Sequence, residues 1–206
     1  MKQSKFSNLQ LDGGCVVFDF INTVNTRTAP ATVDYIECYE DIIVWAEKAA
    51  LLSKKRIRTL SQFAEKNEVN KEAVFKKAIK TRDVLYSLFS AIVKGKNPGT
   101  RILNEFNKIL AASFSKMQLN ISSLKSEISF SGNIVSLDEP IRIIVKSAYD
   151  ILTSENRAIL KECPGCGWLF IDKTKNGKRR WCDMKVCGSN DKAKRYYYRK
   201  KAAAGL

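Results

Sequence analysis

The sequence predicts a mainly α-helical protein, in which a multihelical N-terminal domain carries one small β-hairpin and a small cysteine-rich module follows it. Apolar residues recur at spacings of three and four over most of the stretch from residue 34 to residue 152, as on the buried faces of amphipathic helices. Residues 119–137 instead alternate apolar and polar side chains, as a half-buried hairpin does. Four of the six cysteines lie between residues 163 and 187. The 206 residues are enough to bury a core in one or two domains.

Five helices are expected in the N-terminal domain. The first covers residues 34–49, and the second follows Ser53, whose hydroxyl suits the N-cap position. Asn70 is the expected cap of a third, longer helix, and Thr100 is the expected cap of a fourth. Pro140 is expected to open the fifth helix, because proline is tolerated in a first helical turn.

Two segments of this domain lack a helical period. Residues 13–25, GGCVVFDFINTVN, form either a short strand or a buried helical turn, because periodicity does not decide between them. The hairpin is expected to turn at residues 131–133, Ser-Gly-Asn, between strand residues 128–130 and 134–135.

Positive charge is concentrated at the C-terminus. The net charge is +15, and residues 161–206 contribute 13 − 4 = +9, whereas residues 1–160 contribute 23 − 17 = +6. Such asymmetry indicates a polyanionic partner, most simply nucleic acid, although a merely solvated surface would also be basic. We divide the chain into a helical domain, residues 1–158, which we expect to fold alone, and a C-terminal module, residues 159–206.

The protein is expected to be cytoplasmic and to have no membrane partner. The sequence shows neither an apolar run of membrane-spanning length nor a hydrophobic leader. In a reducing compartment, paired cysteines are more often metal ligands than disulfides.

The four clustered cysteines are the expected ligands of one structural Zn²⁺ ion. Their pattern is a CxxC pair, fifteen intervening residues and a second pair separated by four residues, and thiolates serve alone because the chain has no histidine. Redox-active and metal-free cysteines are the alternatives, but a thioredoxin-like CxxC would need a βαβ context. Four thiolates leave no open coordination position, and without histidine the commonest general base is missing, so we do not expect an enzyme. The ligands are Cys163, Cys166, Cys182 and Cys187.

These elements together predict a treble-clef-like zinc finger. A CxxC knuckle would be followed by a hairpin that turns at Asn176-Gly177, and a final helix would carry the last ligand, Cys187, in its first turn. The other two cysteines, Cys15 and Cys38, are expected to be small buried hydrophobic residues.

Basic residues around the cysteines are candidates for contact with phosphate groups. Three tyrosines interrupt the basic helix, and at least one of them is expected to be a core residue because all three cannot face one side. Part of the charge also suits the helix dipole. The candidates are Lys178, Arg179 and Arg180 in the hairpin, and Lys192, Lys194, Arg195 and Arg199 in the helix.

The C-terminal module resembles the CGNR zinc-finger family of bacteria over the stretch CPGCGWLFIDKTKNGKRRWCDMKVCGSNDKAKRYYYRKK. The N-terminal part is similar to the ABATE domain that precedes this finger, in the run FDFINTV followed by Asp41 and Trp45. The resemblance covers nearly the whole chain. It implies DNA binding and a stress-linked role in transcription regulation. The family's Cys-Gly-Asn-Arg reads Cys187-Gly188-Ser189-Asn190 here, so the role of its arginine cannot be transferred, and Ser189 or Asn190 could cap the helix instead.

The leading hypothesis is therefore a zinc-finger DNA-binding regulator, whose helical domain senses a small-molecule effector or forms a homodimer. Duplex DNA is the preferred partner. An RNA- or ribosome-associated protein and a scaffold protein with a purely structural zinc site are the alternatives. Asn22, Arg27 and Asp34 flank an apolar segment and a loop, and are the candidate ligand pocket. With Asp19 they are also the polar group that an enzyme would use, although backbone capping is the simpler interpretation.

Overall fold

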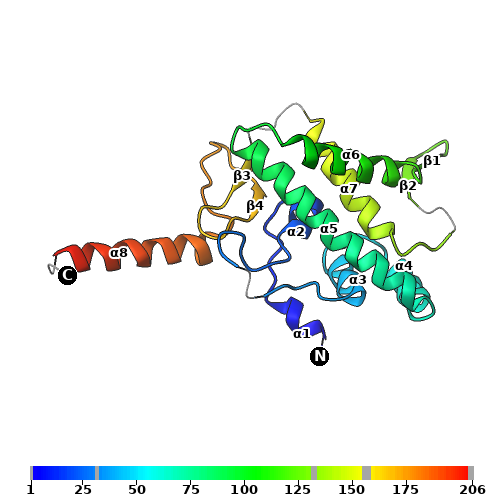
Figure 1. The fold of residues 1–206 in the computed structure, drawn as a ribbon, viewed down its shortest axis with the longest axis horizontal. Helices are drawn as coiled ribbons and strands as arrows, with labels where there is room; N and C mark the ends of the chain where they lie inside the picture. The colour runs from blue at the N-terminus through cyan, green and yellow to red at the C-terminus, as the bar shows by residue number, and fades with distance from the viewer. Residues whose placement is uncertain (1, 31–32, 131–133, 155–158, 204–206) are drawn as a thin grey trace.

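The computed structural model describes residues 2–30, 33–130, 134–154 and 159–203, and shows a helical body from which a single helix projects (Figure 1). Within these residues, no helix combines the length and the hydropathy that a bilayer crossing requires. The helices are α1 (Lys2–Ser7), α2 (Val16–Ile21), α3 (Tyr39–Lys48), α4 (Lys54–Glu65), α5 (Glu68–Val93), α6 (Thr100–Phe114), α7 (Glu139–Leu152) and α8 (Ser189–Ala203), with a π-helical turn, η1 (Met184–Gly188), directly before α8. The strands form two antiparallel pairs, β1 (Gln118–Ile121) with β2 (Ser126–Ser129), and β3 (Leu160–Glu162) with β4 (Leu169–Ile171).

The short helix α2 lies at the centre of the body. Its apolar side chains are buried against α5, α7 and β4. The ring of Phe18 meets the ring of Phe89 edge-to-face at 4.9 Å, and the ring of Phe20 lies 5.3 Å from that of Trp45. Aromatic pairs at such distances add to the stabilisation that burial provides. Residues 16–21 are therefore helical, which settles the ambiguity between strand and helix in the sequence.

Two glycines make the entry to α2 possible. A Cβ on Gly13 would lie 2.7 Å from the Asp19 amide nitrogen, so only glycine fits there. Gly14 has φ of +76°, a conformation that favours glycine. The Asp19 carboxylate accepts a hydrogen bond from the Gly13 amide at 2.9 Å, which closes the turn over the start of the helix.

The expected helices are present, with shifted starts. The Ser53 hydroxyl caps α4 by accepting from the Arg56 amide, and Pro140 lies in the first turn of α7. The expected first helix begins at Tyr39 instead of residue 34, because Asp34 forms a bridge with Val24 and leaves the helical path. The third begins after Asn67 instead of Asn70.

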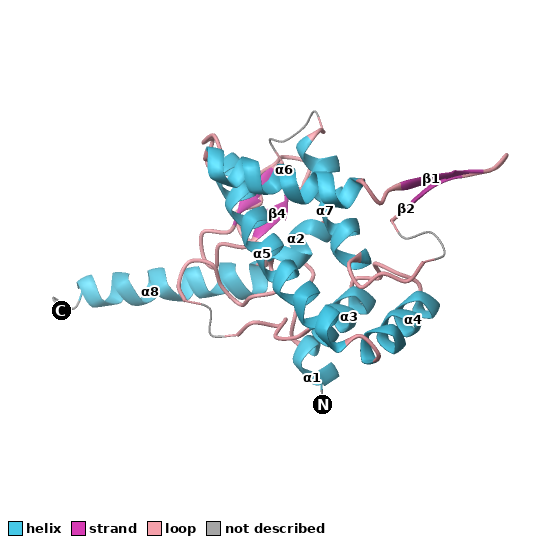
Figure 2. Cartoon of the chain, turned by 45° about the vertical axis from the view of Figure 1, so that its right-hand side comes forward, coloured by secondary structure: helices cyan, strands magenta, loops and turns pink. Residues whose placement is uncertain are grey.

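The helical body carries a hairpin, but β2 pairs with a strand that precedes it, whereas the predicted second strand at residues 134–135 does not form. Strands β1 and β2 are connected by residues 122–125, where the Ser122 amide donates to the Lys125 carbonyl at 2.8 Å. The predicted turn at residues 131–133 lies outside the described residues. The hairpin projects from the side of the body opposite α8 (Figure 2), and its apolar residues Leu119, Ile121 and Ile128 are exposed.

The C-terminal module shares its core with the helical body. Leu160 of β3 and Leu169 of β4 are buried in the same cluster as α2, α5 and α7. The Ile171 amide donates to the Gly13 carbonyl at 2.9 Å, which joins β4 to the turn before α2. The division between residues 158 and 159 remains a prediction about domains, but apolar packing is continuous between the helical body and the strands of the module.

Candidate metal centre and nucleic-acid interface

The four clustered cysteines come together as the sequence predicts. The ligand atoms of Cys163, Cys166, Cys182 and Cys187 all lie within 4.8 Å of one another. The Sγ atoms of Cys166 and Cys182 are 3.5 Å apart, and those of Cys182 and Cys187 are 3.7 Å apart. Zinc–sulfur bonds of about 2.3 Å in a tetrahedron put the sulfurs about 3.8 Å apart. The cluster therefore has the dimensions of a structural zinc site with four cysteine ligands.

The first ligand pair lies in the loop that connects β3 to β4. The Cys163 amide donates to the Trp168 carbonyl, and the Gly167 amide donates to the Cys163 carbonyl, both at 2.8 Å. These bonds fold residues 163–168 into a tight knuckle. Gly167 has φ of +74°, and a Cβ there would lie 2.8 Å from the Cβ of Arg27. The knuckle thus requires glycine both for its backbone conformation and for its contact with the helical body.

The second ligand pair is positioned differently from the prediction. No strand forms among residues 172–181, so the expected hairpin across Asn176-Gly177 is absent, and the paired strands flank the first knuckle instead. The buried Asp172 carboxylate organises this loop by accepting from the Thr174 amide at 3.0 Å and from the Arg179 amide at 2.8 Å. These bonds satisfy the loop without a strand ladder.

Cys187 lies in η1, which runs directly into α8. The Asp183 carboxylate caps η1 by accepting from the Lys185 amide at 2.7 Å. Because η1 continues directly into α8, Ser189 and Asn190 lie inside one helical run that Asp183 caps, so neither residue has the proposed capping role.

Crowding of the four thiols favours a bound cation. Hydrogen bonds from Cys166 and Cys182 hold the pKa of Cys163 well below its ordinary value. Hydrogen bonding to Cys163, together with burial, raises the pKa of Cys182. Four thiolates can occupy this space together only when a positive ion offsets their repulsion, as Zn²⁺ does. Cys15 lies outside the cluster, and burial raises the pKa of its thiol to about 12, as for an inert structural cysteine.

The segment after α2 holds the knuckle from the other side. Asn22, which is 1% exposed, donates to the Leu169 carbonyl at 2.8 Å and accepts from the Leu169 amide at 3.1 Å. The Trp168 indole donates to the Val24 carbonyl at 2.7 Å, and the Arg27 amide donates to the Cys166 carbonyl at 2.6 Å. The N-terminal segment therefore supports the metal site directly, a role that the sequence interpretation missed.

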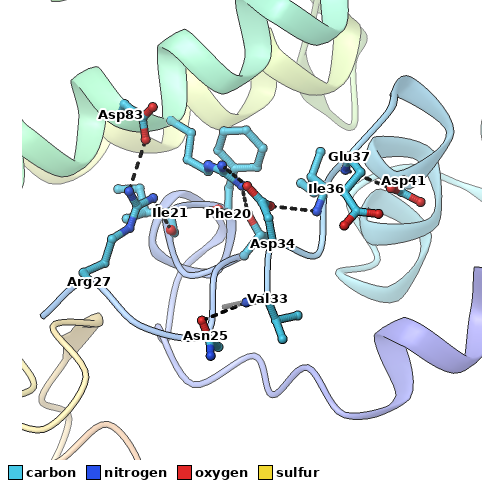
Figure 3. Close-up of polar contacts among 12 residues, drawn as sticks. Phe20, Ile21, Asn25, Arg27, Val33, Asp34, Ile36, Glu37, Asp41 and Asp83 are labelled. Carbon is cyan, nitrogen blue, oxygen red and sulfur yellow. Dashed lines mark hydrogen bonds and ion pairs between the residues drawn. The ribbon is translucent and has the colours of Figure 1, made fainter. Parts of the chain in front are cut away.

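Arg27 and Asp34 anchor this segment to α5 (Figure 3). Arg27 donates to Asp83 of α5 at 3.1 Å and to the Ile21 carbonyl at 2.9 Å. Asp34 accepts two hydrogen bonds from Arg82 of α5, at 2.8 and 2.6 Å. The three residues of the predicted pocket thus make separate contacts inside the protein: Asn22 contacts β4, and Arg27 and Asp34 contact different side chains of α5.

The basic residues of the loop divide into two groups. The guanidinium of Arg179 donates to the Trp181 and Cys182 carbonyls and lies 4.7 Å from the centre of the Phe170 ring. These contacts give Arg179 a structural role beside the zinc ligands. Lys178 and Arg180 are exposed, and Arg180 lies over the Trp181 ring at 5.0 Å. These two side chains remain available to a partner.

Helix α8 exposes its basic residues almost completely. Residues 192–202 are all exposed, and the helix projects away from the body and packs chiefly against η1 (Figure 1). Helical periodicity places Lys192, Arg195 and Arg199 on one face, and Lys194 near the opposite face. Tyr196, Tyr197 and Tyr198 are 61%, 62% and 66% exposed, so the expectation that one of them enters the core is wrong. A projecting helix has no core beside it to receive a tyrosine.

One of the residues that the prediction missed carries a local sequence signal. Asp172 precedes a polar loop, and aspartate in such a position commonly accepts hydrogen bonds from nearby amides. No comparable local signal marks Asn22, because its partner Leu169 lies 147 residues away in the sequence.

The chain is a zinc-finger protein with one structural Zn²⁺ site. Its four-cysteine site is held between the helical body and the C-terminal segment, and an exposed basic helix follows. The comparisons give the particular family. The ABATE family model, described as "Putative stress-induced transcription regulator", matches residues 14–127, more than half of the chain, and the CGNR zinc finger model matches residues 160–200. The chain therefore belongs to the ABATE family and carries a C-terminal CGNR zinc finger. No curated protein matches it.

Proposed function

We propose that this protein is a bacterial, cytoplasmic DNA-binding transcription regulator, in which the zinc finger binds duplex DNA and the helical body acts as a sensor or dimerisation domain. The observation that carries the proposal is helix α8. It has six basic residues against one acidic residue, and its described side chains from residue 192 onward are exposed. A basic helix without apolar neighbours is well suited to a polyanion. The stress-linked role implied by the family description is part of the proposal.

The dimensions of α8 suit a groove of duplex DNA. Its 15 residues span about 22 Å at 1.5 Å per residue, and the major groove admits an α-helix. Charges on both faces could reach the phosphates on either side of that groove. The ion pair between Arg195 and Asp191 is exposed, and such pairs contribute only about 0–1 kcal/mol, so Arg195 can exchange it for a phosphate contact.

The zinc site would fix the direction of this helix. Cys187 is a ligand within η1, and η1 continues into α8 without a break. The knuckle that holds the other ligands is hydrogen-bonded to the segment after α2 through Arg27 and Trp168. A change in the helical body could therefore reach the base of α8 through directly bonded groups.

The test is the salt dependence of DNA affinity. Changing Lys192, Arg195 and Arg199 together to Ala should flatten the slope of log affinity against log salt by roughly 3 units, because each phosphate contact releases about 0.9 counterion. A matched control changes Lys54, Lys55 and Arg58, three exposed basic residues of α4, to Ala. The control lowers the net charge equally and should leave the slope nearly unchanged. Equal effects of the two triple variants would refute a specific role for α8.

Single-stranded RNA is the second candidate partner, and the exposure of all three tyrosines favours it. Aromatic stacking contributes about 1–3 kcal/mol per base. If RNA is the partner, changing Tyr197 to Ala should weaken binding more than changing Lys194 to Ala. Titrations of both variants with duplex DNA and single-stranded RNA separate the two proposals. Absence of binding to either polymer at about 50 mM salt, where phosphate contacts are strong, would leave the scaffold interpretation.

The proposed dimerisation role has its own test. Light scattering of the zinc-loaded chain over a range of protein concentrations should give the mass of a dimer. A mass of 23.3 kDa at every concentration would refute dimerisation, and the sensor role would then be the one remaining proposal for the helical body.

A further inference from the structure

A small cavity lies between the zinc site and the N-terminal segments of the body. Its volume is about 180 Å³, below the range of roughly 300–1,000 Å³ that holds drug-sized ligands, so it suits a compact molecule. Three parts of the chain line it: the segment before α2, the segment between α2 and α3, and the finger. It is distinct from the polar contacts of Asn22, Arg27 and Asp34, none of which is among its lining residues.

The walls of this cavity carry an excess of negative charge. Asp12 and Asp183 line it beside the cysteine ligands. Zn²⁺ held by four thiolates has a net charge of about −2, which adds to the two carboxylates. Among the described residues, no hydrogen bond or ion pair engages the Asp12 carboxylate, and Arg179, whose charge acts on it, already donates to two backbone carbonyls. A partly buried carboxylate beside other negative groups is costly unless a cation offsets it.

The remaining walls combine two aromatic residues with an apolar residue, Val186, and three amide residues, Asn8, Gln10 and Asn25. Tyr35 and Trp168 line the cavity, and both are partly buried. The indole N–H of Trp168 is already used by the Val24 carbonyl at 2.7 Å, so Trp168 offers its apolar ring to an occupant. Aromatic rings next to carboxylates attract organic cations, because the ring face and the carboxylate are both negative.

We infer that this cavity binds a small organic cation, an ammonium group that carries apolar substituents. The carboxylates would offset its charge, and the rings of Tyr35 and Trp168 would contact its apolar groups. The inference does not depend on nucleic-acid binding. The cavity nevertheless reaches Val186 and Cys187, so its occupant would contact the turn from which α8 extends.

Choline is a suitable probe, and 3,3-dimethylbutan-1-ol is its neutral analogue of nearly equal shape. Each is titrated into the full-length, zinc-loaded chain at constant ionic strength, with the Trp168 indole and the Asp12 and Asp183 amides followed by NMR. We expect saturable shifts at these signals with choline, and binding of the alcohol that is weaker by about tenfold or more, as for loss of one charged contact. Equal binding of the two compounds, or no saturable shift with choline, would overturn the inference.

Variants of the cavity give the second half of the test. Asp12→Asn should weaken choline binding about tenfold, whereas Asp150→Asn, an exposed carboxylate on α7, should not change it. Without choline, Asp12→Asn should melt no lower than the parent, because it removes an unpaired charge; a lower melting temperature would show that the protein itself satisfies this carboxylate. Tyr35→Leu keeps an apolar wall without the ring and should also weaken choline. Unchanged choline binding in both Asp12→Asn and Tyr35→Leu would refute the site.

Discussion

Replacing Asn22 with Ala tests whether the helical body and the metal site form one cooperative unit. The Asn22 side chain makes two hydrogen bonds, at 2.8 and 3.1 Å, to the backbone of Leu169, and both residues are buried. Alanine would leave the Leu169 amide and carbonyl without these partners. Each buried unpaired group costs about 1–3 kcal/mol, so the free energy of unfolding should fall by about 2–6 kcal/mol. That is a large share of the roughly 5–15 kcal/mol that stabilises a typical domain.

The assay has two readouts on zinc-loaded protein: urea unfolding, and the rate at which a chromogenic chelator removes zinc. Asn22→Ala should lower the unfolding midpoint and accelerate zinc removal, because β4 directly follows the first ligand pair. Asn120→Ala is the matched control, since it removes an exposed hydrogen bond to Ser129 and should change stability by no more than about 0.5 kcal/mol. If Asn22→Ala behaves like this control in both readouts, the bonds between α2 and β4 do not couple the body to the metal site.

Elemental analysis of protein purified without added metal should find one zinc per chain, and Cys163→Ser should lose it; a zinc content near zero in the parent would contradict the four-cysteine site. Gly167→Ala should lower the melting temperature more than Gly177→Ala, because both glycines have positive φ but only a Cβ on Gly167 would meet a neighbour within 3 Å. Equal losses in the two variants would show that this close contact is unimportant. Burial raises the pKa of Asp19 from 3.8 to about 6, so the contribution of this group to stability is full below pH 3.8 and is lost as pH rises through 6. Asp19→Asn should therefore raise the melting temperature relative to the parent more at pH 8 than at pH 5. A difference in melting temperature that does not change with pH would contradict this. Residues 1–158, which we expected from the sequence to fold alone, should lack a cooperative thermal transition because their core is completed by β3 and β4; a sharp transition would restore the original expectation.

Local patterns accounted for the elements whose signals lie close together in the sequence. Ser53 caps α4 through the Arg56 amide three residues away, and Pro140 lies in the first turn of α7, so the starts of both helices were predictable. The hairpin was recognisable by its alternation, but the prediction paired residues 128–130 with residues 134–135, across the one glycine of this stretch, and the second of these strands does not form. The observed turn at residues 122–125 contains no glycine and is stabilised by Ser122 bonds to Lys125. The hairpin predicted before Cys182 is also absent, although Asn176-Gly177 is a typical hairpin turn. The buried Asp172 carboxylate accepts hydrogen bonds from backbone amides that a second strand would otherwise have bonded.

The sequence by itself determined the zinc ligands, the helical class of the body and the basic character of the C-terminal helix. Ligand chemistry depends on residue type and short spacing, helices on a period of 3.6 residues, and charge on composition, and all three are local properties. Only the tertiary structure decided that Asn22 and Arg27 support the knuckle, that Arg179 is bonded to backbone carbonyls, and that all three tyrosines of α8 face solvent. These outcomes depend on which distant segments meet: Asn22 and Leu169 become partners across 147 residues, because burying the apolar faces of α2 and β4 in one core brings their backbones together.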